Sequence, residues 1–250
     1  MNNALTEDRS QPARSSAFGW WHAAPRSAKK ALVAASFGWM LDSFDIMLYS
    51  LVLASLMADL HLSKGSAGVL GSMTLLAAAA GGLVFGIIAD RFGRTRALMA
   101  SILIYAIFTA ACGLAQNFVQ LAVFRILLGL GMGGEWASGA SLVSETWPAE
   151  HRGKALGFMQ SSWAIGYALA AFVAAVVMPL GGWRAVFFVG VLPALLTLWI
   201  QRSVEEPEVW KKTRNVAATT FGGFAEIFRG KLLPLTVVIT LMNEIGRAHV

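Results

Sequence analysis

Charged residues are scarce in this sequence of 250 residues. They make up 14% of the chain, whereas a typical soluble domain carries roughly 25%. Hydrophobic residues make up 56%, and the mean hydropathy is +0.61. A water-soluble fold of this length would have to expose more apolar surface than solubility permits. The composition therefore argues against a soluble enzyme, a disordered chain and a nucleic-acid-binding domain, and it predicts a membrane protein.

Cysteine and histidine are also rare. The single cysteine, Cys112, lies inside an apolar run, which excludes a disulfide framework. The four histidines fall in predicted loops or near the ends of the chain, so we expect no metal site and no cofactor. No His-Glu-x-x-His helix or nucleophile elbow occurs in a suitable setting, so the sequence gives no sign of an enzyme.

Apolar runs long enough to cross a bilayer organise the chain. A spanning helix needs about 20 mainly apolar residues, and six runs meet this requirement. They cover approximately residues 31–58, 67–89, 97–116, 119–144, 154–180 and 183–201. The sequence thus predicts an all-α polytopic membrane protein.

The segments around these spans complete the predicted domain organisation. Residues 1–30 are polar, lack the features of a signal peptide and are expected to form a cytoplasmic tail. Residues 31–201 form the six-helix unit, residues 202–231 a cytoplasmic loop, and residues 232–243 the start of a seventh span.

The last seven residues, 244–250, break the apolar run of the seventh span without any turn signal. They match the translation of a stretch containing the start of a sequencing adapter, so we expect them to be an artefact of a truncated gene. Resequencing the locus tests this expectation.

Positive charge lies mainly on one side of the predicted spans. Sixteen of the 20 lysines and arginines fall in the N-terminal tail, the even-numbered loops and the segment after span six, whereas the opposite loops contain only Lys64 and Arg184. The positive-inside rule therefore predicts a cytoplasmic N-terminus. The net charge of +6 then reflects topology and requires no nucleic acid.

The loop between spans two and three carries the strongest motif, with glycines and arginines at fixed spacing around one aspartate. Gly93 provides backbone freedom for a short turn, while the arginines lie at headgroup level. The residues are Gly86, Asp90, Arg91, Gly93, Arg94 and Arg96. This loop resembles the signature loop of the major facilitator superfamily, except that Thr95 replaces a residue that is often basic there.

Two further segments resemble the same superfamily. Span four carries Arg125 followed by a glycine series that ends at Glu135, and the next loop contains Glu145, Arg152 and Gly153. The resemblance implies the N-terminal half of a major facilitator fold, a six-helix bundle built as a 3+3 inverted repeat. It also implies that the two loops form a cytoplasmic gate, and that six further spans are missing.

Four ionisable residues lie inside predicted spans, where a charge costs about 2.5–3.5 kcal/mol on insertion scales. They are Asp42, Asp45, Arg125 and Glu135. Counting about 1.5 Å per residue places Asp45 and Arg125 at the same depth, roughly 22 Å above the cytoplasmic edge, so these two residues can pair. We interpret all four as proton-coupling candidates; the alternatives are a structural ion pair for Asp45 and Arg125, and gating or helix-end pairing for Asp42 and Glu135.

Residues 41–45 resemble an element of the proton symporters for organic acids, including the sialate, lactate and aromatic-acid groups, with Ser43 in place of a glycine. This resemblance implies proton-coupled symport of a small organic anion in the cell inner membrane. Residues 205–210 instead resemble an element of sugar porters, so a sugar or polyol porter remains an alternative. A membrane sensor without transport activity is a third possibility.

Aromatic and amide side chains at mid-depth are candidates for the wall of a substrate cavity. Gln160, Trp163 and Tyr167 fall on one face of span five, and Trp39 lies deep in span one. Packing inside the bundle is an equally good interpretation of these four residues.

Overall fold

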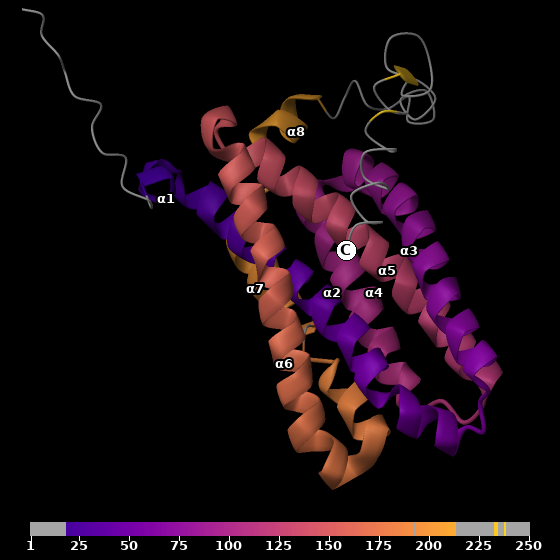
Figure 1. Cartoon of the computed structure of the whole chain (residues 1–250). Helices are drawn as coiled ribbons and strands as arrows, with labels where there is room; N and C mark the ends of the chain where they lie inside the picture. Colours follow the sequence, from indigo (N-terminus) through magenta and orange to yellow (C-terminus); the bar gives the residue numbers. More distant parts are fainter. Residues whose placement is uncertain (1–18, 193, 214–232, 235–237, 239–250) are drawn as a thin grey trace, which may run out of the picture.

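The computed structural model of the chain describes residues 19–192, 194–213, 233–234 and 238. These residues form a helical structure (Figure 1). The helices are α1 (Gly19–Ala23), α2 (Arg26–Asp59), α3 (Lys64–Phe92), α4 (Arg94–Cys112), α5 (Phe118–Thr146), α6 (Ala149–Val189), α7 (Ala194–Ser203) and α8 (Glu208–Thr213).

Local sequence explains where several of these helices begin. The Ser63 side chain accepts a hydrogen bond from the backbone N–H of Ser66 and caps α3, while Asn117 does the same for α5 through Gln120. Helix α2 begins at Arg26, before the expected apolar start at residue 31. Pro25 immediately precedes it with φ −64°, a backbone angle already suited to helix entry.

Five helices are long and apolar enough to cross a membrane: α2, α3, α4, α5 and α6. They run side by side in Figure 1, and α1 and α8 lie at the same end of the bundle. Helices α3 and α5 approach one another closely because Gly129 and Gly133 have no side chains. A Cβ atom at Gly129 would collide with the backbone oxygen of Thr74, and a Cβ atom at Gly133 would collide with that of Ala78. The glycine series of span four therefore serves packing.

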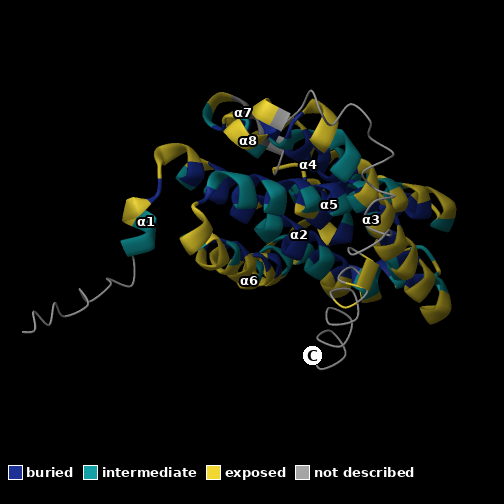
Figure 2. Cartoon of the chain, turned by 90° about the horizontal axis from the view of Figure 1, so that it is seen from above, coloured by how far each residue is buried: buried dark blue, intermediate teal, exposed yellow. Residues whose placement is uncertain are grey.

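Burial differs between the central and outer helices. Figure 2 shows the buried residues concentrated along α2, α4 and α5, while α3 and α6 carry many exposed residues. Many of the exposed side chains are large and apolar, including Leu76, Phe172 and Leu180. An apolar surface of this kind suits contact with lipid or with another membrane domain.

The sixth expected span, residues 183–201, is not a single continuous helix. Helix α6 passes through a kink at Gly182, which has φ 66°, and continues to Val189; α7 then begins at Ala194. Gly190, at the intervening break, packs so closely on Thr109 that a Cβ atom there would collide with that side chain. The described residues thus contain five candidate spans, and the expected sixth is divided between the end of α6 and α7.

Several predicted segments lie largely or wholly outside the described residues. These are most of the tail (1–30), the second half of the loop at 202–231, nearly all of the start of span seven (232–243) and the whole of 244–250.

Candidate functional site

Charged side chains are buried between α2 and α5, which carry all four proton-coupling candidates. Asp42 and Asp45 on α2 and Arg125 and Glu135 on α5 are each at most 3% exposed. Because an unpaired charge is costly in such surroundings, each of these groups needs a partner or a proton.

Asp45 and Arg125 lie near one another, but each forms its hydrogen bond with a threonine. Thr109 Oγ1 donates to Asp45 Oδ1 over 2.9 Å, and Arg125 Nε donates to Thr74 Oγ1 over 3.1 Å. Asp45 interacts electrostatically with Arg125, yet no ion pair within 4.0 Å joins them in the described part of the chain. The predicted common depth thus brings the two groups close together without direct contact.

The Arg125 guanidinium is further held by an aromatic ring. Its Cζ atom lies 3.9 Å from the centroid of the Tyr49 ring, within the range of a cation–π interaction. The Tyr49 hydroxyl in turn donates to the backbone oxygen of Ala67 on α3. Arg125 Nη1 and Asp45 Oδ2 have no hydrogen-bond partner among the described residues, so each group retains bonding capacity.

A cavity of about 680 Å³ lies beside this buried cluster and is lined by residues of α2, α3, α5 and α6. Trp39, Gln160 and Trp163, three of the four residues chosen as cavity candidates, line it. Trp39 also packs against Trp136 and Trp163, with ring centroids 4.5 and 4.8 Å apart. The cavity therefore combines an indole wall with an amide and one acid, Asp42.

Tyr167 differs from the other cavity candidates. It lies on α6 beyond Trp163, is 54% exposed and is not part of the cavity lining. Gly166, the residue before it, packs directly against the backbone of Met40 on α2.

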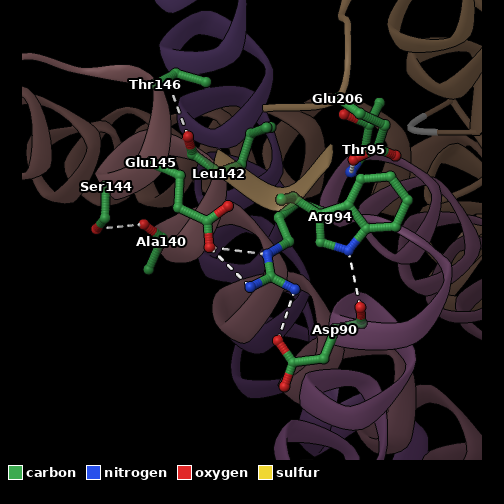
Figure 3. A network of polar contacts seen from close by, with 10 residues as sticks. Asp90, Arg94, Thr95, Ala140, Leu142, Ser144, Glu145, Thr146 and Glu206 are labelled. Atoms are coloured by element: carbon green, nitrogen blue, oxygen red, sulfur yellow. Dashed lines mark hydrogen bonds and ion pairs between the residues drawn. The ribbon is translucent and has the colours of Figure 1, made fainter. Parts of the chain in front are cut away.

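A second polar cluster lies at the end of the bundle where α3 meets α4 (Figure 3). Arg94 Nε and Nη2 donate to Glu145 Oε1 over 2.9 and 2.8 Å, and Arg94 Nη1 lies 2.6 Å from Asp90 Oδ1. Asp90, Arg94 and Glu145 come from three different helices, α3, α4 and α5. The arginine therefore ties these helix ends together, and its partly buried position strengthens the charge-assisted bonds.

The segment after α7 completes this cluster. Glu206 accepts hydrogen bonds from the backbone N–H groups of Thr95 and Arg96, both at 3.2 Å, and so caps the start of α4. Trp210 Nε1 donates to the backbone oxygen of Asp90 over 2.8 Å. Gly93, between α3 and α4, has φ 117°, which confirms the expectation that this turn requires a glycine.

The remaining residues of the expected gate lie outside this cluster. Arg91 is exposed above the Phe92 ring, 5.5 Å from its centroid, while Arg152 and Gly153 are exposed in the first turn of α6. Gly86 lies further down α3, where a Cβ atom would meet nothing within 4 Å. Of these four, none makes a polar contact with the cluster in the described residues.

Five residues that contribute to these sites were not among the candidates chosen from the sequence. They are Tyr49, Thr74, Thr109, Glu206 and Trp210. The motif at residues 205–210, which resembles an element of sugar porters, contains Glu206 and Trp210 and so could have indicated both. Nothing in the sequence distinguishes Thr74 or Thr109 from other threonines in apolar helices.

Buried charges beside a cavity, in a bundle of helices long and apolar enough to span a membrane, are typical of membrane transporters. Comparison with known proteins specifies the family. The model of the Major Facilitator Superfamily matches residues 35–245, so the chain belongs to that family of transporters. Membership confirms the resemblance seen in the signature loop.

Three relatives are identical to this chain at a third or more of the aligned positions. A probable 4-methylmuconolactone transporter of Cupriavidus pinatubonensis is 41% identical over 236 residues, which is 92% of this chain and 55% of that protein. The sialic acid transporter NanX of Escherichia coli is 34% identical over 90% of this chain and 55% of its own length. The cis,cis-muconate transport protein of Acinetobacter baylyi is 38% identical over 74% of this chain and 45% of its own length. The chain spans about half the length of these relatives.

Solved structures support the fold. A D-xylose–proton symporter matches with a TM-score of 0.65 and 23% identity over 86% of this chain and 56% of its own. An inward-facing bacterial homologue of the human lysosomal transporter Spinster matches with a TM-score of 0.68 and 22% identity, over 74% of this chain and 44% of its own. At this identity the likeness concerns the fold alone.

Proposed function

We propose that this chain forms the N-terminal half of a proton-coupled symporter for a small organic anion, which works by alternating access. The observation that carries the proposal is the Asp45–Arg125 site. There a buried carboxyl group and a buried guanidinium each retain one atom without a hydrogen-bond partner among the described residues. The muconate and sialic acid transporters among its relatives support an organic acid as the substrate.

Coupling in this proposal follows from the charges. While Asp45 is ionised, it attracts Arg125 and holds the guanidinium toward α2. A proton on Asp45 removes that attraction, so the carboxylate of a substrate becomes the better partner for Arg125. Asp45 and Arg125 therefore link proton binding to anion binding, with Thr109 and Thr74 positioning them.

The Asp90–Arg94–Glu145 cluster would act as a gate on the cytoplasmic side. The positive-inside rule predicts that its arginine-rich turn and the N-terminus lie in the cytoplasm. We expect a multi-pass protein of the cell inner membrane. In the complete transporter, a second half of the fold packs on the exposed apolar faces and closes the cavity.

Uptake by the full-length protein in proteoliposomes tests the substrate class. Under an imposed pH gradient we expect saturable accumulation of at least one of lactate, a benzoate-type acid or sialate. Saturable hexose uptake without acid uptake would favour the sugar-porter alternative instead. No uptake of any of these compounds would count against the proposal and leave the sensor alternative standing.

Asp45→Asn tests the coupling step because the amide cannot take up the proton. We expect the variant to lose uphill accumulation while it still exchanges labelled for unlabelled substrate. Asp59→Asn, the same substitution at the exposed end of the same helix, is the matched control and should accumulate substrate normally. Unchanged proton-driven uptake by Asp45→Asn would refute the role of Asp45.

A further inference from the structure

Negative charge exceeds positive charge among the buried side chains. The described residues bury three carboxyl groups, on Asp42, Asp45 and Glu135, but one guanidinium, that of Arg125. Asp45 is accounted for, since it accepts from Thr109 and lies in the field of Arg125. Asp42 and Glu135 remain without a cation to balance them.

Glu135 fits into a recess in the surface of α2. A Cβ atom at Gly38 would collide with Glu135 Oε1, so only a glycine leaves room for this carboxyl group. Gly38 lies one helical turn before Asp42 and on the same face of α2. Glu135 therefore points from α5 at the side of α2 that carries Asp42.

The Asp42 and Glu135 carboxyl groups are close enough for their charges to interact. In the described part of the chain, no amide, hydroxyl or guanidinium group donates to Asp42 Oδ1 or to either oxygen of Glu135. Two ionised carboxylates this close would repel one another, and among the described residues no donor to Asp42 Oδ1 or to Glu135 offsets the cost of burial.

The groups around the pair do not relieve this repulsion. On the neighbouring turn of α2 lies Asp45, another acid, and α4 presents Tyr105, whose hydroxyl has no hydrogen-bond partner among the described residues. Arg125 interacts with Asp45 and stacks on Tyr49. The cavity wall beside Asp42 adds Gln160 and Trp163 from α6 and apolar residues from α3, none of which carries charge.

We propose that Asp42 and Glu135 share one proton and form a proton-binding site separate from Asp45 and Arg125. One carboxyl group keeps the proton and donates it in a hydrogen bond to the carboxylate of the other, so the pair carries a single negative charge. The use of this site in transport rests on the proposed function, whereas the geometry of the site does not.

Asp42 is the entrance to this site. It lines the cavity, whereas Glu135 is fully buried behind it and does not. A hydronium ion in the cavity transfers its proton to Asp42 and leaves water; release reverses the step. Both carboxyl groups can therefore be ionised together only while water in the cavity reaches Asp42 and takes up the released proton.

Infrared spectroscopy of the full-length protein tests the proposal directly, since a protonated carboxyl group has a C=O stretching band distinct from that of a carboxylate. At neutral pH the wild-type protein should show this band. Asp42→Asn and Glu135→Gln should each abolish the same band, because either substitution leaves no second carboxyl group to share the proton. Asp45→Asn is the control and should retain the band.

Three results would overturn the proposal. The first is the absence of the carboxylic acid band in the wild-type protein, and the second is a band that persists unchanged in Asp42→Asn or Glu135→Gln. The third is a band that disappears when sodium replaces choline in the buffer, which would show that the pair holds a metal cation. These spectra need no substrate, so a failure to transport organic acids would refute the proposed function and leave the shared proton standing.

Discussion

Gly93→Ala is the substitution whose cost can be worked out most fully from the structure. Gly93 joins α3 to α4 with φ 117° and ψ 149°, a backbone conformation that is essentially restricted to glycine. A Cβ atom there would also collide with the carboxyl group of Glu206. The variant must therefore strain its own backbone and displace Glu206 from the start of α4.

The two effects can be added. Holding a non-glycine residue in such a conformation costs about 1–3 kcal/mol. Displacing Glu206 breaks its hydrogen bonds with the backbone N–H groups of Thr95 and Arg96, each worth about 0.5–1.5 kcal/mol. We expect Gly93→Ala to lower the free energy of unfolding by about 2–6 kcal/mol.

Unfolding of the full-length protein in mixed detergent and SDS micelles, followed by circular dichroism, measures this loss. Gly86→Ala is the matched control, since a Cβ atom at this helical position meets nothing within 4 Å. It should be neutral, or stabilising by about 0.5–1 kcal/mol.

The background variant Glu206→Ala separates the two effects. In that background, Gly93→Ala should cost only the backbone part, about 1–3 kcal/mol. An equal cost in both backgrounds would refute the argument from Glu206, and a Gly93→Ala variant as stable as Gly86→Ala would refute the argument from backbone strain.

Three further predictions concern other parts of the molecule. Arg184→Ala removes a bond of 2.5 Å to Asp59, but both side chains are about half exposed, so the stability that this pair contributes should be small and should shrink in high salt. Gly133→Leu should prevent folding or stable insertion, measured as the yield of monodisperse protein, because α3 and α5 are in backbone contact there; a well-folded variant would contradict this packing. Gln160→Ala should raise the KM for substrate several-fold because Gln160 lines the cavity. The neighbouring substitution Ser161→Ala should leave the KM unchanged. Equal KM values for the two variants would show that Gln160 does not contribute to substrate binding.

The positions of the helices were largely predictable, because a spanning helix must be apolar over its whole length. The first four expected spans correspond to α2, α3, α4 and α5 with boundaries shifted by a few residues. The sixth was not predicted correctly as a continuous helix. Hydropathy records that residues 183–201 are apolar, but it does not show that the helix ends at Val189, next to the close contact of Gly190 with Thr109.

The candidate site was predictable in its ionisable residues but not in their partners. Charges inside apolar runs are conspicuous, so Asp42, Asp45, Arg125 and Glu135 could be chosen from the sequence alone. Counting residues along two helices also placed Asp45 and Arg125 at a common depth. Counting gives no rotation about the helix axis, and therefore did not show that each residue bonds a threonine.

By itself, the sequence determined that this protein lies in a membrane and which few residues carry charge within it, since both follow from composition along the chain. Tertiary structure alone decided which of these residues meet. The carboxyl group of Glu135 reaches Asp42 because α5 crosses α2 where Gly38 leaves a recess, and Glu206 reaches the start of α4 from a segment 110 residues away. Such contacts depend on how the helices cross and rotate, which packing across the whole bundle determines.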